Sequence, residues 1–238
     1  MRVRDKAIVL QAIKHGDRQS IVKLYTKGHG LLTVIASAGR SPSSKIRSAS
    51  LLPLSLIEIN FTLRQNREIH RLSEAASYYV HDNINTSLAK LSIAQFINEV
   101  LLKSLKEQQA NEALYDFVEG CINYLNDTGR DYTNLHIYFL RELSKHLGFE
   151  PHNNFSEESL YFDCREGVFS GLSLPFPLGL GVEDSELFSV MLQKNILREK
   201  LEHKQRQWLL EIWLAYFQLH IPNFNELKSL EVLREVNR

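Results

Sequence analysis

Three side chains spaced two residues apart, Lys23, Tyr25 and Lys27, combine positive charge with an aromatic ring. In an extended strand they share one face, while Val22 and Leu24 point to the other. Lysine neutralises backbone phosphates, and an exposed ring stacks on a base for about 1–3 kcal/mol. The pattern therefore predicts a surface that binds nucleic acid. The ordinary alternative is that Tyr25 caps a core and the lysines are simple solvent-facing residues.

The segment from Gly39 to Ser48 is basic and contains no acidic residue. It carries Arg40, Lys45 and Arg47 among serines, and all of these side chains can contact phosphate oxygens. Basic loops are often merely solvated, but this one follows a basic strand, which favours nucleic acid over simple solvation. The other cations that we include in the predicted DNA-binding surface are Lys14, Arg18, Arg64, Arg67 and Arg71.

The charge of the chain is strongly segregated, although 28 Lys/Arg and 28 Asp/Glu give a formal net charge of zero. Residues 1–80 hold 13 basic and 5 acidic residues, a net charge of +8, and the remainder holds 15 and 23, a net charge of −8. Such asymmetry favours a polyanion-binding domain attached to a domain with a different role. The alternative is that a small strand-rich domain is basic only for solubility.

Patterns typical of catalysis are missing from the sequence. There is no Walker-type phosphate loop, and Gly179-Leu180-Gly181 is better interpreted as a turn. Cys164 has no second cysteine at zinc-finger spacing, although His152 is near in sequence. No histidine pair or nucleophile motif suggests an active site. We therefore predict no catalytic residue, no metal and no cofactor.

The N-terminus lacks an apolar stretch of signal-peptide length, and no segment approaches the roughly 20 apolar residues of a membrane-spanning helix. The two cysteines, Cys121 and Cys164, lie in regions that we expect to belong to different structural units, so a disulfide is not expected. We expect a cytoplasmic, nucleoid-associated protein with no membrane partner.

The first 80 residues show apolar alternation in short runs separated by turn residues. We expect strands at Lys6–Ile13, Ser20–Thr26, Leu31–Ala38, Leu54–Leu63 and Glu68–Ser73. Five strands in about 75 residues predict a five-stranded β-barrel of the OB-fold type, whose surface commonly binds single strands.

Beyond residue 80 the apolar period changes to about 3.6, which indicates helices. We expect them at Thr86–Lys103, along a stripe from Leu114 to Leu125, and at Asn134–Leu147, Ser185–Leu201 and Lys204–Leu219, followed by a last segment from Asn225 to Val236. Residues 159–170 are instead typical of a hairpin inserted in this part. The prediction is an α+β multidomain protein, with an OB-fold at residues 1–80 and an all-helical domain with a zinc-free hairpin at residues 81–238.

Several motifs, in order along the chain, resemble those of the RecO family. They are Gly16-Asp17-Arg18-Gln19-Ser20-Ile21-Val22, Tyr25-Thr26-Lys27-Gly28-His29-Gly30, Ala38-Gly39-Arg40 with Ser44-Lys45, Leu52-Pro53-Leu54 before Ile57-Glu58, Leu140 to Pro151, and His220 with Leu227 to Leu233. Each motif alone is common, but their order and spacing extend over nearly the whole chain.

The resemblance implies a recombination mediator in DNA repair. Such a protein binds single- and double-stranded DNA, anneals complementary strands, and helps to load the recombinase on strands coated by single-strand-binding protein. It also implies two protein partners, RecR and the acidic tail of single-strand-binding protein. Many members carry a four-cysteine zinc motif after the helix end that is Leu147 to Pro151 here. Only Cys164 remains in that stretch, so we predict no zinc.

An acidic tail needs a local basic site in the acidic second domain. Arg141 and Lys145, one helical turn apart, are the candidates for this site, and the alternative is that they serve surface solubility. Two other functions stay open on the residues alone. They are an RNA-binding or translation-related OB-fold module and a scaffold that contacts only proteins.

Overall fold

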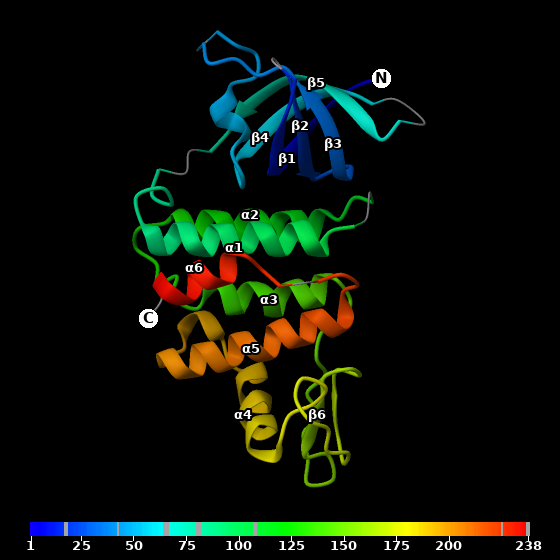
Figure 1. The fold of residues 1–238 in the computed structure, drawn as a ribbon, viewed down its shortest axis with the longest axis vertical. Coiled ribbons are helices and arrows are strands. Elements are labelled where there is room, and N and C mark those ends of the chain that lie inside the picture. The colour runs from blue at the N-terminus through cyan, green and yellow to red at the C-terminus, as the bar shows by residue number, and fades with distance from the viewer. Residues whose placement is uncertain are drawn as a thin grey trace. The chain divides into compact units, whose positions relative to one another are not determined.

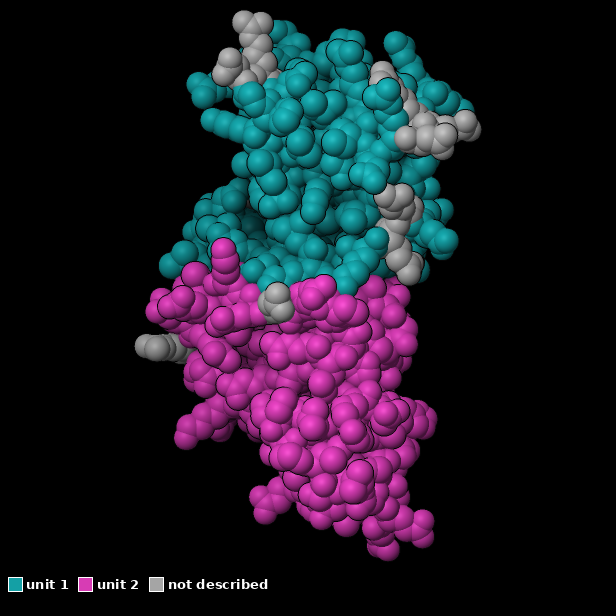
Figure 2. Space-filling model, turned by 45° about the vertical axis from the view of Figure 1, so that its right-hand side comes forward, with its two compact units in different colours: residues 1–128 teal, residues 129–238 magenta. Residues whose placement is uncertain are grey.

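The computed structural model describes residues 1–16, 19–41, 43–63, 67–79, 82–106, 109–224 and 226–236. These form two compact units, residues 1–128 and residues 129–238, which Figure 2 draws in different colours. The first unit contains a β-barrel and two helices, and the second contains the other helices and a hairpin. The domain boundary predicted after residue 80 stays a prediction about which part of the chain folds independently.

The barrel of the first unit is built from five strands. Their bounds are β1, Arg2–His15; β2, Gln19–Thr26; β3, Gly30–Ala36; β4, Leu56–Thr62; and β5, Ile69–Ser77. The strands close in the order β1-β2-β3-β5-β4 (Figure 1), and only β3 and β5 are parallel neighbours. The five-stranded barrel predicted from the sequence is confirmed. A 3-10 helix, η1, spans Ser48–Leu51 before β4.

Apolar side chains at alternate positions of the strands fill the barrel interior. Val22, Leu24 and Val34 are fully buried there, because alternate residues of β2 and β3 point inward. Strand β1 is long enough to pair with β4 through its first half and with β2 through its second half. Its register with β2 shifts between Val9 and Gln11. Such a bulge bends the strand, and the bend allows one strand to close the barrel.

Two helices complete the first unit, α1 at Leu88–Ser104 and α2 at Glu112–Asn126. The side chains of Ser87 and Asn111 cap them, each accepting a hydrogen bond from the backbone N–H three residues later. The predicted apolar stripe of α2 is buried at Leu114, Val118, Cys121, Ile122 and Leu125. The change of period after residue 80 therefore identified these helices correctly.

The second unit contains four α-helices and one hairpin among its described residues. The elements are α3, Leu135–His146; β6, Tyr161–Asp163; β7, Val168–Ser170; α4, Val182–Gln193; η2, a 3-10 helix at Ile196–Arg198; α5, His203–His220; and α6, Ser229–Val236. The helical region with a small hairpin is thus as predicted. In the part of the chain that is described, no helix is long and apolar enough to cross a membrane.

The helix predicted from Ser185 to Leu201 is wrong in its bounds. Helix α4 ends at Gln193, and the chain continues through an extended Lys194 into η2. The guanidinium of Arg141 on α3 donates hydrogen bonds to the carbonyls of Leu192, at 2.6 Å, and Lys194, at 2.7 Å. Because these carbonyls are satisfied by a side chain from another helix, the end of α4 was not visible in its own sequence.

The hairpin packs on aromatic rings of α4 and α5. The buried ring of Phe162 in β6 lies 4.8 Å from Phe188 of α4 and 6.0 Å from Tyr216 of α5, measured between centroids. The Tyr216 hydroxyl donates to the backbone oxygen of Phe149. Gly167, at the hairpin turn, has a positive φ, and a Cβ there would clash with that hydroxyl. Apolar packing and a close backbone approach therefore hold the hairpin.

Candidate nucleic-acid interface

Lys23 lies near the middle of β2, on the outer side of the barrel. Lys23 is exposed between Val22 and Leu24, whose side chains lie in the barrel interior. The strand registers place Gln11 of β1 on one side of Lys23 and Thr33 of β3 on the other. The alternation predicted for this strand is therefore correct, and the ammonium group of Lys23 stands on an open polar surface.

The other end of the same strand is covered by helix α2. Tyr25 is only 2% exposed, its ring lies 6.2 Å from that of Tyr115, and its hydroxyl donates to the backbone oxygen of Asn111. Burial raises the pKa of Tyr25 to about 12. Lys27 forms a 2.7 Å ion pair with Asp116 of α2. The expectation of an exposed stacking ring at Tyr25 is wrong, because a helix packs on this part of the barrel wall.

A polar network joins α2 to the barrel beside this contact. The hydroxyl of Tyr78 donates to Glu119 at 2.5 Å and lies 3.0 Å from the hydroxyl of Tyr115. Burial raises the pKa of both tyrosines. The ammonium of Lys6 lies over the Tyr78 ring, 4.7 Å from its centroid. These contacts hold α2 against the barrel.

A row of isoleucines crosses the uncovered half of the barrel wall. Ile13 of β1 pairs with Ile21 of β2, and Ile21 pairs with Ile35 of β3. Cross-strand partners project from the same side of a sheet, so the three side chains are neighbours. Ile13 is 53% exposed, and Ile69, beside Thr33 in the next row, is 45% exposed. An aliphatic surface thus stands where the sequence predicted an aromatic one.

Two arginines frame the end of this row. Arg71 of β5 lies beside Ile35, and Thr62 of β4 pairs with both Arg71 and Arg2. The two arginines line a hollow of about 520 Å³, together with Lys45 from the loop before η1. The ammonium of Lys45 is 2.8 Å from Glu74, and this hydrogen bond lowers the pKa of the Glu74 carboxyl. The hollow is basic, with one carboxylate at its margin.

Sequence reasoning missed Arg2. The residue is near the N-terminus, more than 60 positions from Arg71, and only the closure of the barrel brings the two together. The signal that was available is the pair of arginines at positions 2 and 4. Of these, Arg4 forms an ion pair with Glu58 at 2.5 Å, whereas Arg2 lines the hollow.

The basic loop before η1 is closed at its neck. The backbone N–H of Gly39 donates to Ile46 at 2.9 Å, and that of Ser48 donates to Gly39 at 3.0 Å. Arg40 and Arg47 are exposed on this loop, and neither makes an ion pair with another described residue. Lys14 follows Ile13 in β1 and, by strand alternation, projects to the other face of the strand. It lines a groove of about 430 Å³ together with Leu51 and Leu52.

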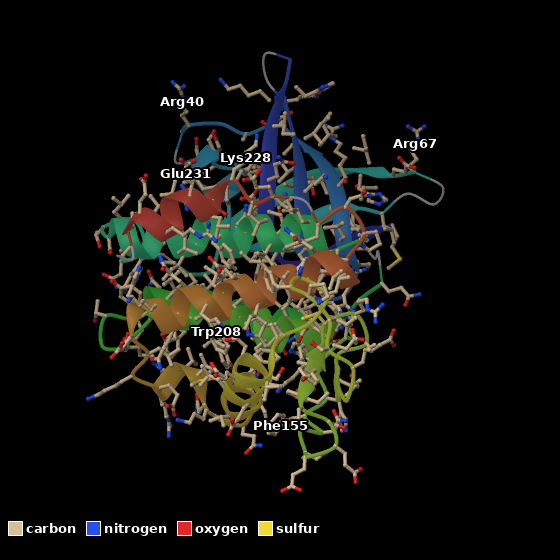
Figure 3. The ribbon with its side chains drawn as sticks, turned by 60° about the horizontal axis from the view of Figure 1, so that its bottom comes forward. Arg40, Arg67, Phe155, Trp208, Lys228 and Glu231 are labelled. Atoms are coloured by element: carbon tan, nitrogen blue, oxygen red, sulfur yellow. The ribbon has the colours of Figure 1, made fainter. Side chains whose placement is uncertain are left out.

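The remaining predicted cations are spread around the barrel. Arg67 is exposed, and Figure 3 shows Arg67 and Arg40 projecting from opposite sides of the barrel. Arg18 and Arg64 lie outside the described residues. The structure therefore brings Arg71 and Lys45 together at the hollow, with Lys23 on the same wall. Arg40, Arg47 and Lys14 are not among the residues that line the hollow.

Arg141 and Lys145, predicted to bind an acidic tail, already have partners within the second unit. The guanidinium of Arg141 donates to two carbonyls at the end of α4. The ammonium of Lys145 lies 3.2 Å from Glu142 and 3.3 Å from Glu150. The tail-binding role stays a prediction, and these contacts argue against it because they occupy the donors that an incoming carboxylate needs.

The region of Cys164 is packed rather than arranged for coordination. The thiol is fully buried, and burial raises its pKa to about 12, which disfavours the thiolate that binds metal. The Nε2 atom of His220 lies 3.0 Å from the Cys164 backbone oxygen, and the His220 ring stacks on Phe149. Among the described residues, no group of three or more His, Cys, Asp or Glu side chains is placed to hold a metal ion.

Fold and surface together define a class: a small barrel with an open basic wall, carried by a helical unit with an inserted hairpin. The family model for the N-terminal part of recombination protein O matches residues 1–79, and the model for the C-terminal part matches residues 85–231. The chain therefore belongs to the recombination protein O family, RecO, as its motifs predicted. It is a protein of DNA repair and recombination, in a family of non-enzymatic mediators.

The sequence similarity to related proteins extends over nearly the full length of the chains. The chain is 30% identical to a DNA repair protein RecO of Phocaeicola vulgatus, over 96% of both chains. It is 32% identical to the DNA repair protein RecO of Flavobacterium psychrophilum and 31% identical to that of Flavobacterium johnsoniae, over 99% of each chain. The similarity thus includes both units, and not the barrel alone.

Proposed function

We propose that the barrel binds single- and double-stranded DNA with little base selectivity, anneals complementary strands, and assists recombinase loading on strands coated by single-strand-binding protein. The observation that carries this proposal is the open barrel wall, where an isoleucine row ends at Arg71 with Lys23 beside it. Membership of the RecO family supports the repair role.

The cations of this wall act on the DNA backbone. Lys23, Arg71 and Arg2 neutralise phosphates and release counterions, so affinity falls as salt rises. Phosphate contacts position a strand without reading its sequence. A mediator that must act on any damaged region needs this kind of binding.

The isoleucine row acts on bases. Ile13, Ile21 and Ile35 offer an apolar surface to the faces of unstacked bases, whereas a duplex keeps its bases stacked inside and presents phosphates. Single strands therefore use both parts of the wall, and duplex DNA uses the cations.

Annealing requires two strands on one protein. Arg2, Lys45 and Arg71 line the hollow, whereas Arg40 and Arg47 are exposed on the loop before η1 and do not line it. We assign one strand to each group. The protein then reduces the repulsion between two backbones while complementary bases pair, and no covalent chemistry is needed.

RecR and single-strand-binding protein are the partners that we propose from the family. Arg141 and Lys145 are the pair to be tested for binding of the acidic tail. We propose that the protein acts in the cytoplasm, at the nucleoid.

The decisive experiment is the annealing of complementary strands coated with the cognate single-strand-binding protein, with and without this chain. Acceleration supports the mediator role, and no acceleration contradicts it. Competition between single-stranded DNA and RNA of equal length tests the RNA-binding alternative, which predicts a strong RNA preference. Titration at increasing salt tests the protein-only scaffold, which predicts no salt-dependent DNA binding.

Reversal of charge tests the two groups separately. The double variant Arg40→Glu, Arg47→Glu reverses the charge of the loop group, and Lys23→Glu with Arg71→Glu reverses the charge of the wall. We expect each to weaken DNA binding and to slow annealing. Unchanged affinity in either variant removes that group from the binding surface.

A further inference from the structure

Two apolar faces of this chain are open to solvent, and they carry opposite charge. The first is the barrel wall, with Ile13 53% exposed and Ile69 45% exposed beside Lys23 and Arg71. The second is on the hairpin lobe, which we define as residues 150–193. On α4 it exposes Leu187 by 36% and Val190 by 43%, and elsewhere in the lobe it exposes Leu172 by 57% and Phe176 by 58%.

The outer face of α4 shows the pattern most clearly. Glu183, Glu186, Leu187 and Val190 occur at helical spacing and are all exposed, while Ser185, Phe188, Ser189 and Met191 on the opposite face are buried. The exposed face thus begins with two carboxylates and continues with two apolar side chains. Trp208 of α5 stands next to it (Figure 3), its indole N–H donating to Asp184 at 2.9 Å.

The hairpin lobe is strongly acidic. Residues 150–193 contain eight Asp and Glu residues and a single basic residue, Arg165. The guanidinium of Arg165 is paired with Asp163 at 2.8 Å, so it does not offset the exposed carboxylates around it. Residues 1–80, which form the barrel, hold 13 basic and 5 acidic residues.

We infer that the open face of the hairpin lobe docks on the open barrel wall of a second copy of this chain. The two faces match in chemistry, since each combines exposed aliphatic or aromatic groups with charge, and the charges are complementary. The contact joins two different faces, so it is head-to-tail and can extend beyond two copies.

This contact occupies the wall assigned to DNA. One part of the inference, competition between the second copy and DNA, therefore rests on the proposed function, whereas self-association does not. A chain free of DNA associates and covers its apolar wall, and a strand of DNA displaces the acidic lobe. The protein is therefore self-associated in the absence of DNA, and DNA binding dissociates the copies.

The experiment is sedimentation velocity of the full chain over a concentration series at low and moderate salt. We expect the average mass to rise with concentration at low salt, and the dissociation constant to increase at least about tenfold at moderate salt, because exposed ion pairs are screened. A mass that stays at one chain across the series at low salt overturns the inference. So does a salt-dependent change of shape that is independent of concentration.

Two charge-reversed variants make the test specific. Glu183→Lys with Glu186→Lys makes the lobe face basic, and Lys23→Glu with Arg71→Glu makes the wall acidic. Each variant alone is expected to remain a single chain, whereas an equimolar mixture of the two is expected to associate. Failure of the mixture to associate contradicts the pairing of these faces.

The matched control is Glu231→Lys with Glu235→Lys, which makes the same change of charge on exposed positions of α6. We expect this variant to associate as the unmodified chain does, and loss of association would overturn the assignment to α4. Adding a single-stranded oligonucleotide to the associated protein then tests competition. Association without any DNA binding contradicts the proposed function alone, and DNA binding without association contradicts this inference alone.

Discussion

The arginines of the barrel and those of the second unit have different tasks. On the barrel wall, Arg71 projects outward between strands whose backbone groups are already paired in the sheet. In the second unit, Arg141 donates to two carbonyls at the C-terminal end of α4. A closed barrel leaves few backbone acceptors, whereas the C-terminal end of each helix leaves four carbonyls that an arginine can satisfy. The same residue type is therefore available to a ligand in one unit and structural in the other.

The interiors differ as well. The barrel core is mainly aliphatic and follows from alternation along five strands. The hairpin lobe is too small for such a core, and it depends on a few large rings from α4 and α5. This difference predicts that single core substitutions are most damaging in the lobe.

The largest expected effect is that of Phe162→Ala. The buried ring contacts Phe169, Phe188 and Tyr216, and loss of a buried phenylalanine costs about 3–5 kcal/mol. Thermal unfolding measures the loss of stability in the second unit. DNA binding by the barrel should persist, and its loss would show that the two units do not differ in the way described.

The second-largest expected effect is a loss of stability of the second unit at acidic pH. Burial lowers the pKa of His136, on α3, to about 4 from an ordinary 6.5, so the folded state keeps this histidine neutral. Its contribution is full above pH 6.5 and is lost as pH falls toward 4, by about 3 kcal/mol for a shift of this size. The transition temperature as a function of pH, compared with His136→Gln, measures it. An equal pH dependence in the variant would assign the effect to other groups.

Removal of the arginine that caps α4 should have a smaller effect. Arg141→Ala leaves the carbonyls of Leu192 and Lys194 without their donors, which costs about 1–3 kcal/mol of stability. Chemical denaturation measures the cost. DNA affinity should not change. Loss of binding to the acidic tail, with stability unchanged, would restore the tail-binding role predicted from the sequence.

On the barrel, the double variant Lys23→Glu, Arg71→Glu should lower DNA affinity by about tenfold or more and reduce its salt dependence, since phosphate contacts are lost. Fluorescence anisotropy at several salt concentrations measures both quantities. Lys27→Ala is the control, because this lysine is paired with Asp116 of α2. An equal loss of affinity in the control would contradict the division of β2 into an open and a covered half.

The smallest expected effect concerns the isoleucine row. Ile13→Ser should weaken single-strand binding by about threefold, because each buried methylene contributes about 0.8 kcal/mol, and should leave duplex binding unchanged. Parallel titrations with a single strand and a duplex of equal length measure the ratio. Equal weakening of both would show that bases do not contact this row.

Much of the candidate surface followed from local pattern. Alternation correctly put Lys23 outside the barrel and Val22 inside, and charge counting directed attention to the first 80 residues. Tyr25 was misjudged because alternation distinguishes inside from outside, but does not tell whether a helix covers the outside. Arg2 was missed because its neighbours come from strand pairing across the closed barrel.

What the sequence determined by itself is what depends on neighbouring residues: the five strands, the change to helical period, the hairpin, the separation of charge and the motifs of the family. The tertiary structure alone decided which half of the barrel wall stays open, where α4 ends, and which arginines are consumed as caps. The reason is that these outcomes depend on groups far apart in the chain, such as Arg141 and Lys194, whose contact is visible only after folding.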